Sequence, residues 1–294
     1  MRPTRPFLAL ALLIFGASGA HAFGPLIEPD QLTAESPDLI IDIRGRAAFE
    51  EGHLPGAQHA AYGLWRGPSD NPGRVPDEAA LEALLGSIGA APDQRVLIVH
   101  EGKNQTNFGS AARVYWTLKT AGFTELAILN GGYRAWAETG TPEVGAAEPA
   151  DAVVDITLSD EWWIDADGVA AVVAGSSPAV LIDARPAAFF EGERKHDEAA
   201  EAGTLAGALN IVHSTWFGSD TPRLDAPPEK IEEIRALAAE AGGAPIVSFC
   251  NTGHWAATNW FAVSEIAGVE GVKLYPESMV GWTRLGGAVT LGGG

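Results

Sequence analysis

The sequence predicts an α/β fold made of two similar domains in tandem, each built around a parallel sheet. Short, β-branched apolar runs alternate with helical patterns along the chain, and this alternation is typical of parallel strands covered by helices on both faces. The chain also repeats part of its own sequence at a spacing of about 150 residues. A repeat of that length indicates a duplicated domain.

The first half of the repeat contains a strand that ends in a charged pair. Residues 39–67 and 180–218 both carry an apolar run followed by Asp-x-Arg, an Ala-Ala-Phe step, a Glu-Gly pair, a Leu-x-Gly-Ala turn and a tryptophan. The charged pair is Asp42 with Arg44 in the first copy and Asp183 with Arg185 in the second. The second copy carries about ten extra residues, around 192–203.

The second half of the repeat is a strand, a glycine-containing loop and a helix, followed by a short strand and a tryptophan. It covers residues 95–136 and 244–282. The segment 138–151, rich in Pro, Gly and Glu, predicts the linker. We therefore expect an N-terminal domain over 23–140, a linker over 141–152 and a C-terminal domain over 153–290. Helices are expected over 77–88, 110–121, 228–241 and 256–267.

The N-terminus has the pattern of a secretory signal peptide. Arg2 and Arg5 precede a short apolar run over 7–15, and Ala20-His21-Ala22 places small residues at the cleavage positions. We expect cleavage after about Ala22 and a periplasmic or secreted protein. A membrane anchor is the disfavoured alternative, because the run is too short to span a bilayer.

Composition excludes some classes of partner. Hydrophobic residues make up 46% of the chain, which is enough for packed cores, and the formal charge is −19. Removing Arg2 and Arg5, the only charged residues of 1–22, takes the charge to −21. Such acidity argues against binding to nucleic acid or to an anionic membrane surface.

Cys250 is the only cysteine. An exported protein normally uses cysteines in disulfides, but a single one cannot close a bridge within the chain. It is therefore either a buried apolar side chain or a reactive thiol. It directly follows the strand expected at 245–249, at the edge of a parallel sheet where ligands bind. This position favours the reactive thiol.

The loop "CNTGHW", residues 250–255, links that strand to a helix. So tight a loop turns its backbone N–H groups inward, and the helix adds the positive end of its dipole. Both stabilise a thiolate and make it nucleophilic. Gly253 allows backbone angles that other residues avoid.

These motifs together resemble the tandem rhodaneses of the thiosulfate/3-mercaptopyruvate sulfurtransferase family. The resemblance rests on the two Asp-x-Arg strand ends, the "GHLPGA" and "GTLAGA" turns, the cysteine loop and the "LNGGYRAW" and "LYPESMVGW" closings. It implies two α/β domains, each with a five-stranded parallel sheet and helices on both faces. It also implies that only the C-terminal copy is catalytic, and the cysteine position in the first copy is placed at Glu101.

The resemblance implies a mechanism. Cys250 would take a sulfane sulfur from a small-molecule donor such as thiosulfate, hold it as a persulfide and pass it to a thiophilic acceptor, cyanide or a thiol; a protein acceptor stays open. No metal or organic cofactor is implied. The persulfide would be cradled by the loop residues Asn251, Thr252, Gly253, His254 and Trp255.

Several residues depart from the family pattern. The loop matches neither the thiosulfate nor the mercaptopyruvate subtype, and Phe189 stands where the family has an arginine. Binding of the donor anion must then come from other residues, and the candidates are His254, Arg185, Arg194, Lys195 and His196.

Each candidate has a second interpretation. Arg185 recurs as Arg44 in the copy without cysteine, which favours a structural role. The cluster 194–196 is either a donor-attracting loop or a solvated surface. His254, which ordinarily titrates near neutrality, is expected either to stabilise the thiolate as an imidazolium or to bind the oxygens of the donor. Trp255 and Trp282 form either an apolar wall around the persulfide or part of the core.

Two other functions compete with sulfur transfer. Dual-specificity phosphatases resemble this fold but need Cys-x5-Arg, and Ala256 stands at the arginine position. A non-catalytic module that relays sulfur to a protein partner or senses redox state remains the alternative. A purely structural scaffold is disfavoured because the cysteine is present. Thiosulfate is preferred over 3-mercaptopyruvate as donor, since export would place the protein among inorganic sulfur compounds.

Overall fold

The structure is a computed structural model that describes residues 23–32, 36–148, 150–218 and 221–292. The predicted signal peptide lies outside these residues. Within them, no helix has both the length and the apolar character needed to cross a bilayer.

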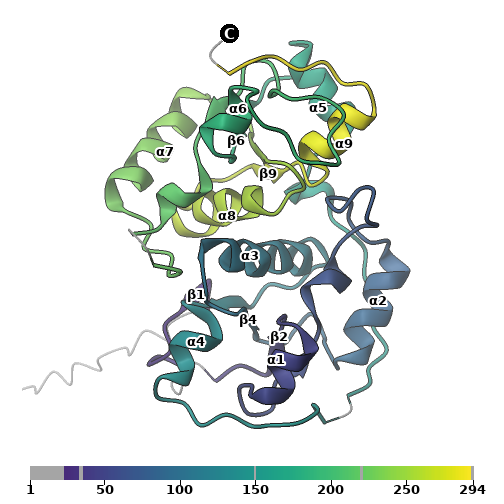
Figure 1. The fold of residues 1–294 in the computed structure, drawn as a ribbon, viewed down its shortest axis with the longest axis vertical. Helices are drawn as coiled ribbons and strands as arrows, with labels where there is room; N and C mark the ends of the chain where they lie inside the picture. The colour runs from purple at the N-terminus through teal and green to yellow at the C-terminus, as the bar shows by residue number, and fades with distance from the viewer. Residues whose placement is uncertain (1–22, 33–35, 149, 219–220, 293–294) are drawn as a thin grey trace, which may run out of the picture.

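The N-terminal domain is a parallel sheet with helices on both faces (Figure 1). Its strand order is β1-β5-β4-β2-β3. Alternate side chains of β4 enter different cores: Val96 and Ile98 pack with α2 and α3, whereas Leu97 and Val99 pack with α1 and α4. The elements are β1 (Leu26–Ile27), β2 (Leu39–Asp42), α1 (Arg46–Glu51), β3 (Gln58–His59), η1 (Tyr62–Trp65), α2 (Glu78–Ser87), β4 (Val96–Val99), α3 (Gln105–Thr120), β5 (Leu126–Leu129) and α4 (Gly132–Ala137).

The C-terminal domain repeats this arrangement with one difference. Its sheet has four parallel strands in the order β7-β6-β8-β9, and the place of a fifth is taken by a single parallel bridge between Trp163 and Leu274. Two parallel-sheet domains are thus confirmed, with five strands and four. The elements are η2 (Asp160–Trp162), α5 (Ala166–Val173), β6 (Val180–Asp183), α6 (Ala187–Phe190), β7 (Leu209–Asn210), η3 (His213–Trp216), α7 (Pro228–Glu240), β8 (Ile246–Phe249), α8 (Trp255–Phe261), a π-helical turn η4 (Ala262–Ile266), β9 (Val272–Leu274) and α9 (Ser278–Arg284).

One helix begins earlier than its apolar pattern predicts. The pattern starts at Ser110, but α3 begins at Gln105. Asn104 caps this end: its side chain accepts from the Asn107 backbone N–H, and the Asn107 side chain accepts from the Asn104 N–H. Such reciprocal capping satisfies donors that a helix start leaves free, so a polar first turn is tolerated.

The strand register corrects the alignment of the two copies. Asp42 pairs with Val99 in the first sheet, and Asp183 pairs with Phe249 in the second. The residue after Val99 is His100, so His100 is the counterpart of Cys250, and Glu101 is the counterpart of Asn251. The placement of the cysteine position at Glu101 was wrong, because loop sequences alone do not show strand register.

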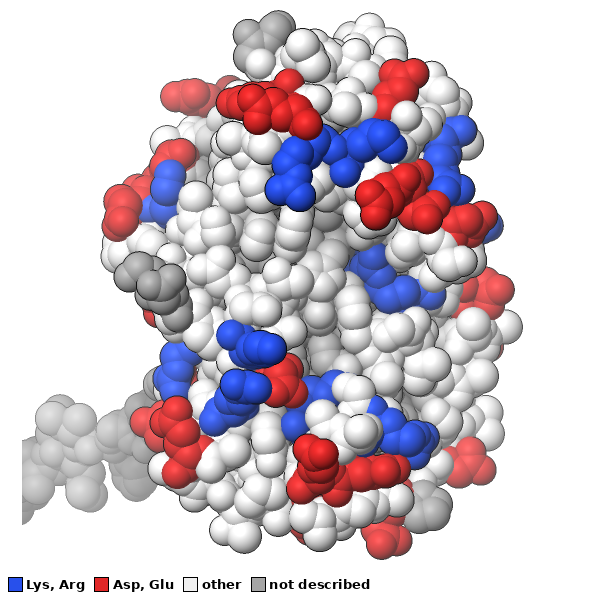
Figure 2. Space-filling model, viewed as in Figure 1, with Lys and Arg blue, Asp and Glu red and all other residues white. Residues whose placement is uncertain are grey.

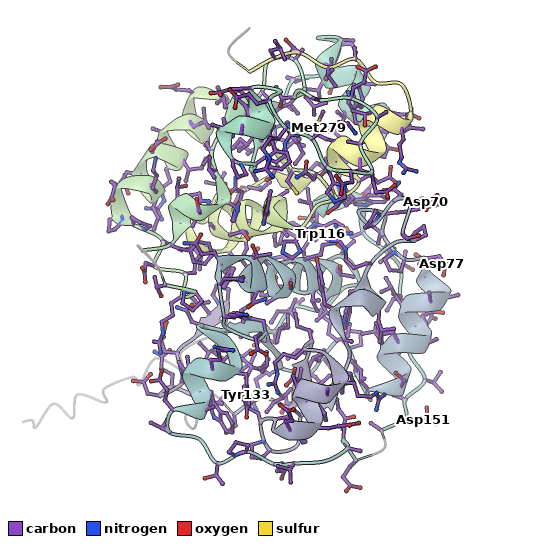
Figure 3. All side chains as sticks on the ribbon, viewed as in Figure 1. Asp70, Asp77, Trp116, Tyr133, Asp151 and Met279 are labelled. Carbon is purple, nitrogen blue, oxygen red and sulfur yellow. The ribbon has the colours of Figure 1, made fainter. Side chains whose placement is uncertain are left out.

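The two domains share one core. Helices α3 and α8 lie side by side across the middle of the molecule (Figure 1), and buried residues of both domains form a single apolar cluster. The Phe108 ring lies 5.5 Å from the rings of both Phe217 and Phe261. Trp116, at the level of this seam in Figure 3, donates its indole N–H to the Trp162 carbonyl at 2.9 Å.

The segment after the predicted linker follows the N-terminal domain before it enters the second sheet. Ala152 N–H donates to the Gly86 carbonyl, and Ile156 N–H donates to the carboxylate of Glu82 on α2. The predicted boundary at 141–152 stays a prediction.

We expect Phe108→Ala to lower the free energy of unfolding by about 3–5 kcal/mol, because the ring is fully buried against the other domain. Both domains should lose stability together. Urea denaturation followed by tryptophan fluorescence would test this, with exposed Val153→Ala as the control. Two separate transitions, only one of them shifted, would contradict a shared core.

Candidate active site

Cys250 directly follows β8 and is almost fully buried, with 1% of its surface exposed. The start of α9 holds its loop in place. Ser278 Oγ accepts from the N–H groups of Cys250 (3.0 Å) and Gly253 (3.1 Å), and Met279 N–H donates to the Cys250 carbonyl. The loop therefore wraps around one serine hydroxyl.

Ser278 has a left-handed backbone, with φ of 53°. Its counterpart in the first copy is Gly132, with φ of 64°, a conformation that is easier for glycine. In the second copy a strained residue carries the hydroxyl that the cysteine loop needs. Backbone strain of this kind is found where surrounding contacts maintain it.

The Cys250 loop leaves several backbone donors free. The N–H groups of Asn251, Thr252, His254 and Trp255 donate to no protein atom among the described residues. Gly253, with φ of 69°, supplies the left-handed turn between them. Free backbone N–H groups in a tight loop are suited to holding an anion. The Gly253 N–H is bound to Ser278, so four of the five residues of the expected cradle keep a free N–H, and their role in holding a persulfide stays a prediction.

Arg185 and Asp183 form a buried pair beside the loop. The Arg185 guanidinium binds the Asp183 carboxylate through Nε and Nη2, and Nη2 also donates to the Gly203 carbonyl at 2.8 Å. Arg44 binds Asp42 and the Gly52 carbonyl in the same way. The recurrence supports the structural interpretation. One difference is that Arg185 Nη1 lies 3.4 Å from Asn251 Oδ1 of the cysteine loop.

The N-terminal domain contacts the Cys250 loop directly. Arg66 donates through Nη2 to the Thr252 carbonyl at 2.8 Å, and Arg113 on α3 donates through Nη1 to the Gly253 carbonyl at 3.4 Å. A Cβ atom at Gly253 would overlap the Arg113 guanidinium and the Pro276 carbonyl. The loop is thus closed from both domains.

His254 points into this interface and is neutral. Its Nε2 lies 2.8 Å from the Thr106 carbonyl, which can only accept, so Nε2 carries the proton and Nδ1 accepts from the Tyr62 hydroxyl at 2.8 Å. Burial, and then the charge of Arg66, lower the pKa of His254 to about 3. The expected imidazolium is therefore wrong.

The aromatic residues near the loop divide into two groups. Trp255 stacks on His213 with ring centroids 4.8 Å apart and meets Phe189 edge-on at 6.1 Å. Trp282 lies in the core of the C-terminal domain with Met279, and its indole N–H donates to the Ala288 carbonyl. The interpretation of Trp282 as core packing is therefore supported, while Trp255 borders the loop.

The basic cluster 194–196 is also divided. The Arg194 guanidinium lies over the Phe189 ring, 5.3 Å from its centroid, and so is linked to Trp255. Lys195 donates to the Ala199 carbonyl at 2.6 Å, and His196 Nδ1 accepts from the Glu198 N–H, so both hold their own loop.

Figure 2 shows that the band between the domains is largely uncharged on this face and is bordered by basic side chains.

Sequence reasoning missed the contribution of the first domain. Tyr62, Arg66 and Arg113 all lie against the cysteine loop or its histidine. Comparing the copies could have found Arg66, because it follows η1 where Phe217 follows η3. A charged residue that replaces an apolar one is a signal of a specific contact.

Comparison with known proteins agrees with this architecture. The model of the rhodanese-like domain matches residues 28–139 and 167–285. The chain belongs to the rhodanese family. It is 28% identical to chicken (Gallus gallus) thiosulfate sulfurtransferase over 242 residues, which are 81% of this chain and 80% of that one. It is 25% identical to the 3-mercaptopyruvate sulfurtransferase of Rattus norvegicus over 243 residues, 81% of this chain and 79% of that one.

A solved rhodanese has the same fold. The crystal structure of the Escherichia coli 3-mercaptopyruvate sulfotransferase SseA superimposes with a TM-score of 0.70 at 25% identity, covering 86% of this chain and 98% of that chain. The tandem arrangement of two rhodanese domains is therefore confirmed. Among the described residues, no three His, Cys, Asp or Glu side chains are grouped as a metal site.

Acid should destabilise this rhodanese through its buried histidines. Burial lowers the pKa of His254 to about 3 and that of His100 and His213 to about 4. Between these values and the unfolded pKa of about 6.5, the unfolded chain binds more protons, so stability falls as pH decreases.

We predict that the free energy of unfolding of His254→Gln depends less steeply on pH between 6.5 and 4 than that of the wild type. The two curves should run parallel from pH 8 to 9, where almost no proton is bound at this site in either state. Urea titrations at each pH measure both slopes. Equal slopes below pH 6.5 would show that His254 is not held neutral.

Proposed function

We propose that this protein is a sulfurtransferase that carries sulfur on Cys250. The observation that supports it most is a thiol at the carboxyl end of a parallel strand, inside a loop with four free backbone N–H groups. The named sulfurtransferases that cover most of the chain support the same reaction class. The N-terminal domain has His100 at the equivalent position and acts as a partner that shapes the site.

The reaction has two steps. The Cys250 thiolate attacks the outer sulfur of the donor and forms a new S–S bond with it. The bond that joined this sulfur to the rest of the donor breaks, and when the donor is thiosulfate, sulfite leaves with the electron pair. A nucleophile such as cyanide attacks the terminal sulfur of the persulfide, leaves as thiocyanate and restores the thiolate. The free N–H groups at 251, 252, 254 and 255 stabilise the anionic sulfur in both steps.

Thiosulfate is the proposed donor. Its charge suits a site with arginines on both sides of the cysteine loop, Arg66 from one domain and Arg185 from the other. Both thiosulfate and mercaptopyruvate enzymes occur among the relatives, so the donor preference rests on these charges and on the proposed export. Arg194, held over Phe189 at the rim, attracts the dianion toward the loop.

Incubation with thiosulfate should add one sulfur atom to the wild-type protein, and peptide mass spectrometry should place it on Cys250. Cys250→Ser should gain none and should lose cyanide-dependent turnover, because an alcohol does not attack sulfane sulfur under these conditions. The native fold, checked by circular dichroism, serves as the control. Undiminished turnover in Cys250→Ser would overturn the proposed function. Sulfur loading without turnover to any small acceptor would favour a relay to a protein partner.

Arg194→Ala should raise the KM for thiosulfate several-fold with little change in kcat, and more at low ionic strength, where charges are least screened. Lys195→Ala is the matched control, because that ammonium group is bound to the Ala199 carbonyl. Steady-state kinetics with both donors measures this. An equal KM in wild type and Arg194→Ala, or a kcat/KM tenfold higher for 3-mercaptopyruvate, would contradict the assignment.

A further inference from the structure

Arg113 is a fully buried cation without an acidic partner. Its guanidinium donates to the carbonyls of Gly73 (2.8 Å) and Gly253 (3.4 Å), and its Nε has no partner. No carboxylate within the described residues forms an ion pair with it, although the chain has 38 acidic residues against 19 basic ones. Burying a charge without a counter-charge costs several kcal/mol. The two carbonyls and the Trp116 ring, whose centroid lies 4.9 Å from the guanidinium carbon, are neutral partners, and a nearby anion would lower this cost further.

A second cation lies beside it. Arg66, from the end of η1, likewise has neutral partners among the described residues: its guanidinium contacts the Tyr62 hydroxyl and the Thr252 carbonyl. The pKa of Arg113 is lowered to about 9, first by burial and then by Arg66, while Tyr62 and Cys250 oppose this shift. Neither arginine forms an ion pair with a carboxylate in the described part of the chain, so the two form a positive region against the cysteine loop.

The group of opposite charge that can lie next to them is the sulfur of Cys250. Cys250 and Gly253 share the hydroxyl of Ser278, so the guanidinium that contacts Gly253 lies one loop turn from the thiol. A thiolate at Cys250 would raise the pKa of Arg113 and of Tyr62. In a buried site, the attraction between unit charges is much stronger than at the surface.

We infer that Arg113 of the N-terminal domain supplies the fixed positive charge that stabilises the anionic sulfur of Cys250. Arg113 touches the loop and acts on the sulfur through space, so it is a positioning residue. This inference rests on the proposed function, in which the thiolate and the persulfide are the reacting anions. It gives the domain without a cysteine a direct part in the reaction.

Other charged and titratable groups surround the loop and set the background for a test. His254 and His213 are neutral near pH 7, because burial lowers the pKa of each. Arg185 is already bound to Asp183. The pKa of Tyr62 is raised by burial, so its phenol stays protonated. Within the residues that the structure describes, Arg113 and Arg66 are thus the cations at this loop without an acidic partner.

The test measures the thiol without any sulfur donor. The rate of Cys250 alkylation by iodoacetamide is followed from pH 5 to 11 in wild type, Arg113→Met and Arg113→Lys. We expect the midpoint of the pH profile to lie at least one pH unit above the wild-type value in Arg113→Met. In Arg113→Lys, which keeps a positive charge, the midpoint should lie close to the wild-type value. Arg235→Met is the matched control, because Arg235 also donates to a carbonyl, that of Ala267, far along the chain from the loop.

A folded Arg113→Met protein whose midpoint stays within 0.3 units of the wild type would overturn the inference and leave Arg113 as a clamp on two carbonyls. Since donor turnover is not involved, that result is distinguishable from a failure of the proposed function, which persulfide analysis decides separately.

A reciprocal measurement covers the case in which Arg113→Met does not fold. If Arg113 stabilises the thiolate, the thiolate stabilises the protonated guanidinium by the same amount. In protein labelled with ¹³C-arginine, Arg113 should therefore lose its proton at lower pH in Cys250→Ser than in wild type. The same titration midpoint in both proteins would also overturn the inference.

Discussion

The loop of residues 250–254 is held from two domains, and the candidate site depends on that contact. Within its own domain the loop is fixed by the Ser278 hydroxyl. Across the interface, Arg66 and Arg113 bind the carbonyls of Thr252 and Gly253, and Tyr62 and Thr106 bind the two nitrogens of His254. The Thr252–Gly253 peptide is thus held at both ends, its carbonyl by Arg66 and its N–H by Ser278, and the Gly253–His254 peptide is held at its carbonyl by Arg113. One interface thus fixes the peptides of the proposed cradle.

The shared core explains why this contact is rigid. A loop hydrogen bond contributes only about 0.5–1.5 kcal/mol to stability, which is too little to hold two domains in register. The contact between α3 and α8 buries aromatic rings of both domains, including Phe108 and Phe261, in one cluster. The polar contacts then act on surfaces that the core has already aligned. Gly109 of α3 leaves room for the His254 ring, since a Cβ there would come within 3.0 Å of its Cδ2.

The fold could be predicted from the sequence because each copy is specified locally. The second copy repeats the features of the first at a spacing of about 150 residues: the strand and helix patterns, the Asp-x-Arg pairs and the glycine turns. These features predict the two parallel sheets. The position of Cys250 after a strand likewise follows from local pattern. Only the edge of the second sheet differs, since a single bridge at Trp163 replaces a strand there.

Contacts between the copies were not predictable in the same way. The state of His254 depends on Tyr62 and Thr106, which lie far away in the sequence and belong to the other copy. An exposed histidine would titrate near neutrality, so its sequence context pointed to the wrong charge. The alignment of Cys250 with Glu101 failed for a related reason: hydrogen bonds between strands, which place His100 there, leave no mark in the loop sequence.

A double-mutant cycle tests most directly whether the first domain holds the cysteine loop. Tyr62→Phe removes the hydroxyl that donates to His254, and His254→Ala removes its acceptor. The readout is the single-turnover rate of persulfide formation from thiosulfate. If the contact orients the loop, the two substitutions share one effect, and their coupling free energy should be about 1 kcal/mol or more. Additive effects, each the same with or without the other substitution, would contradict the account.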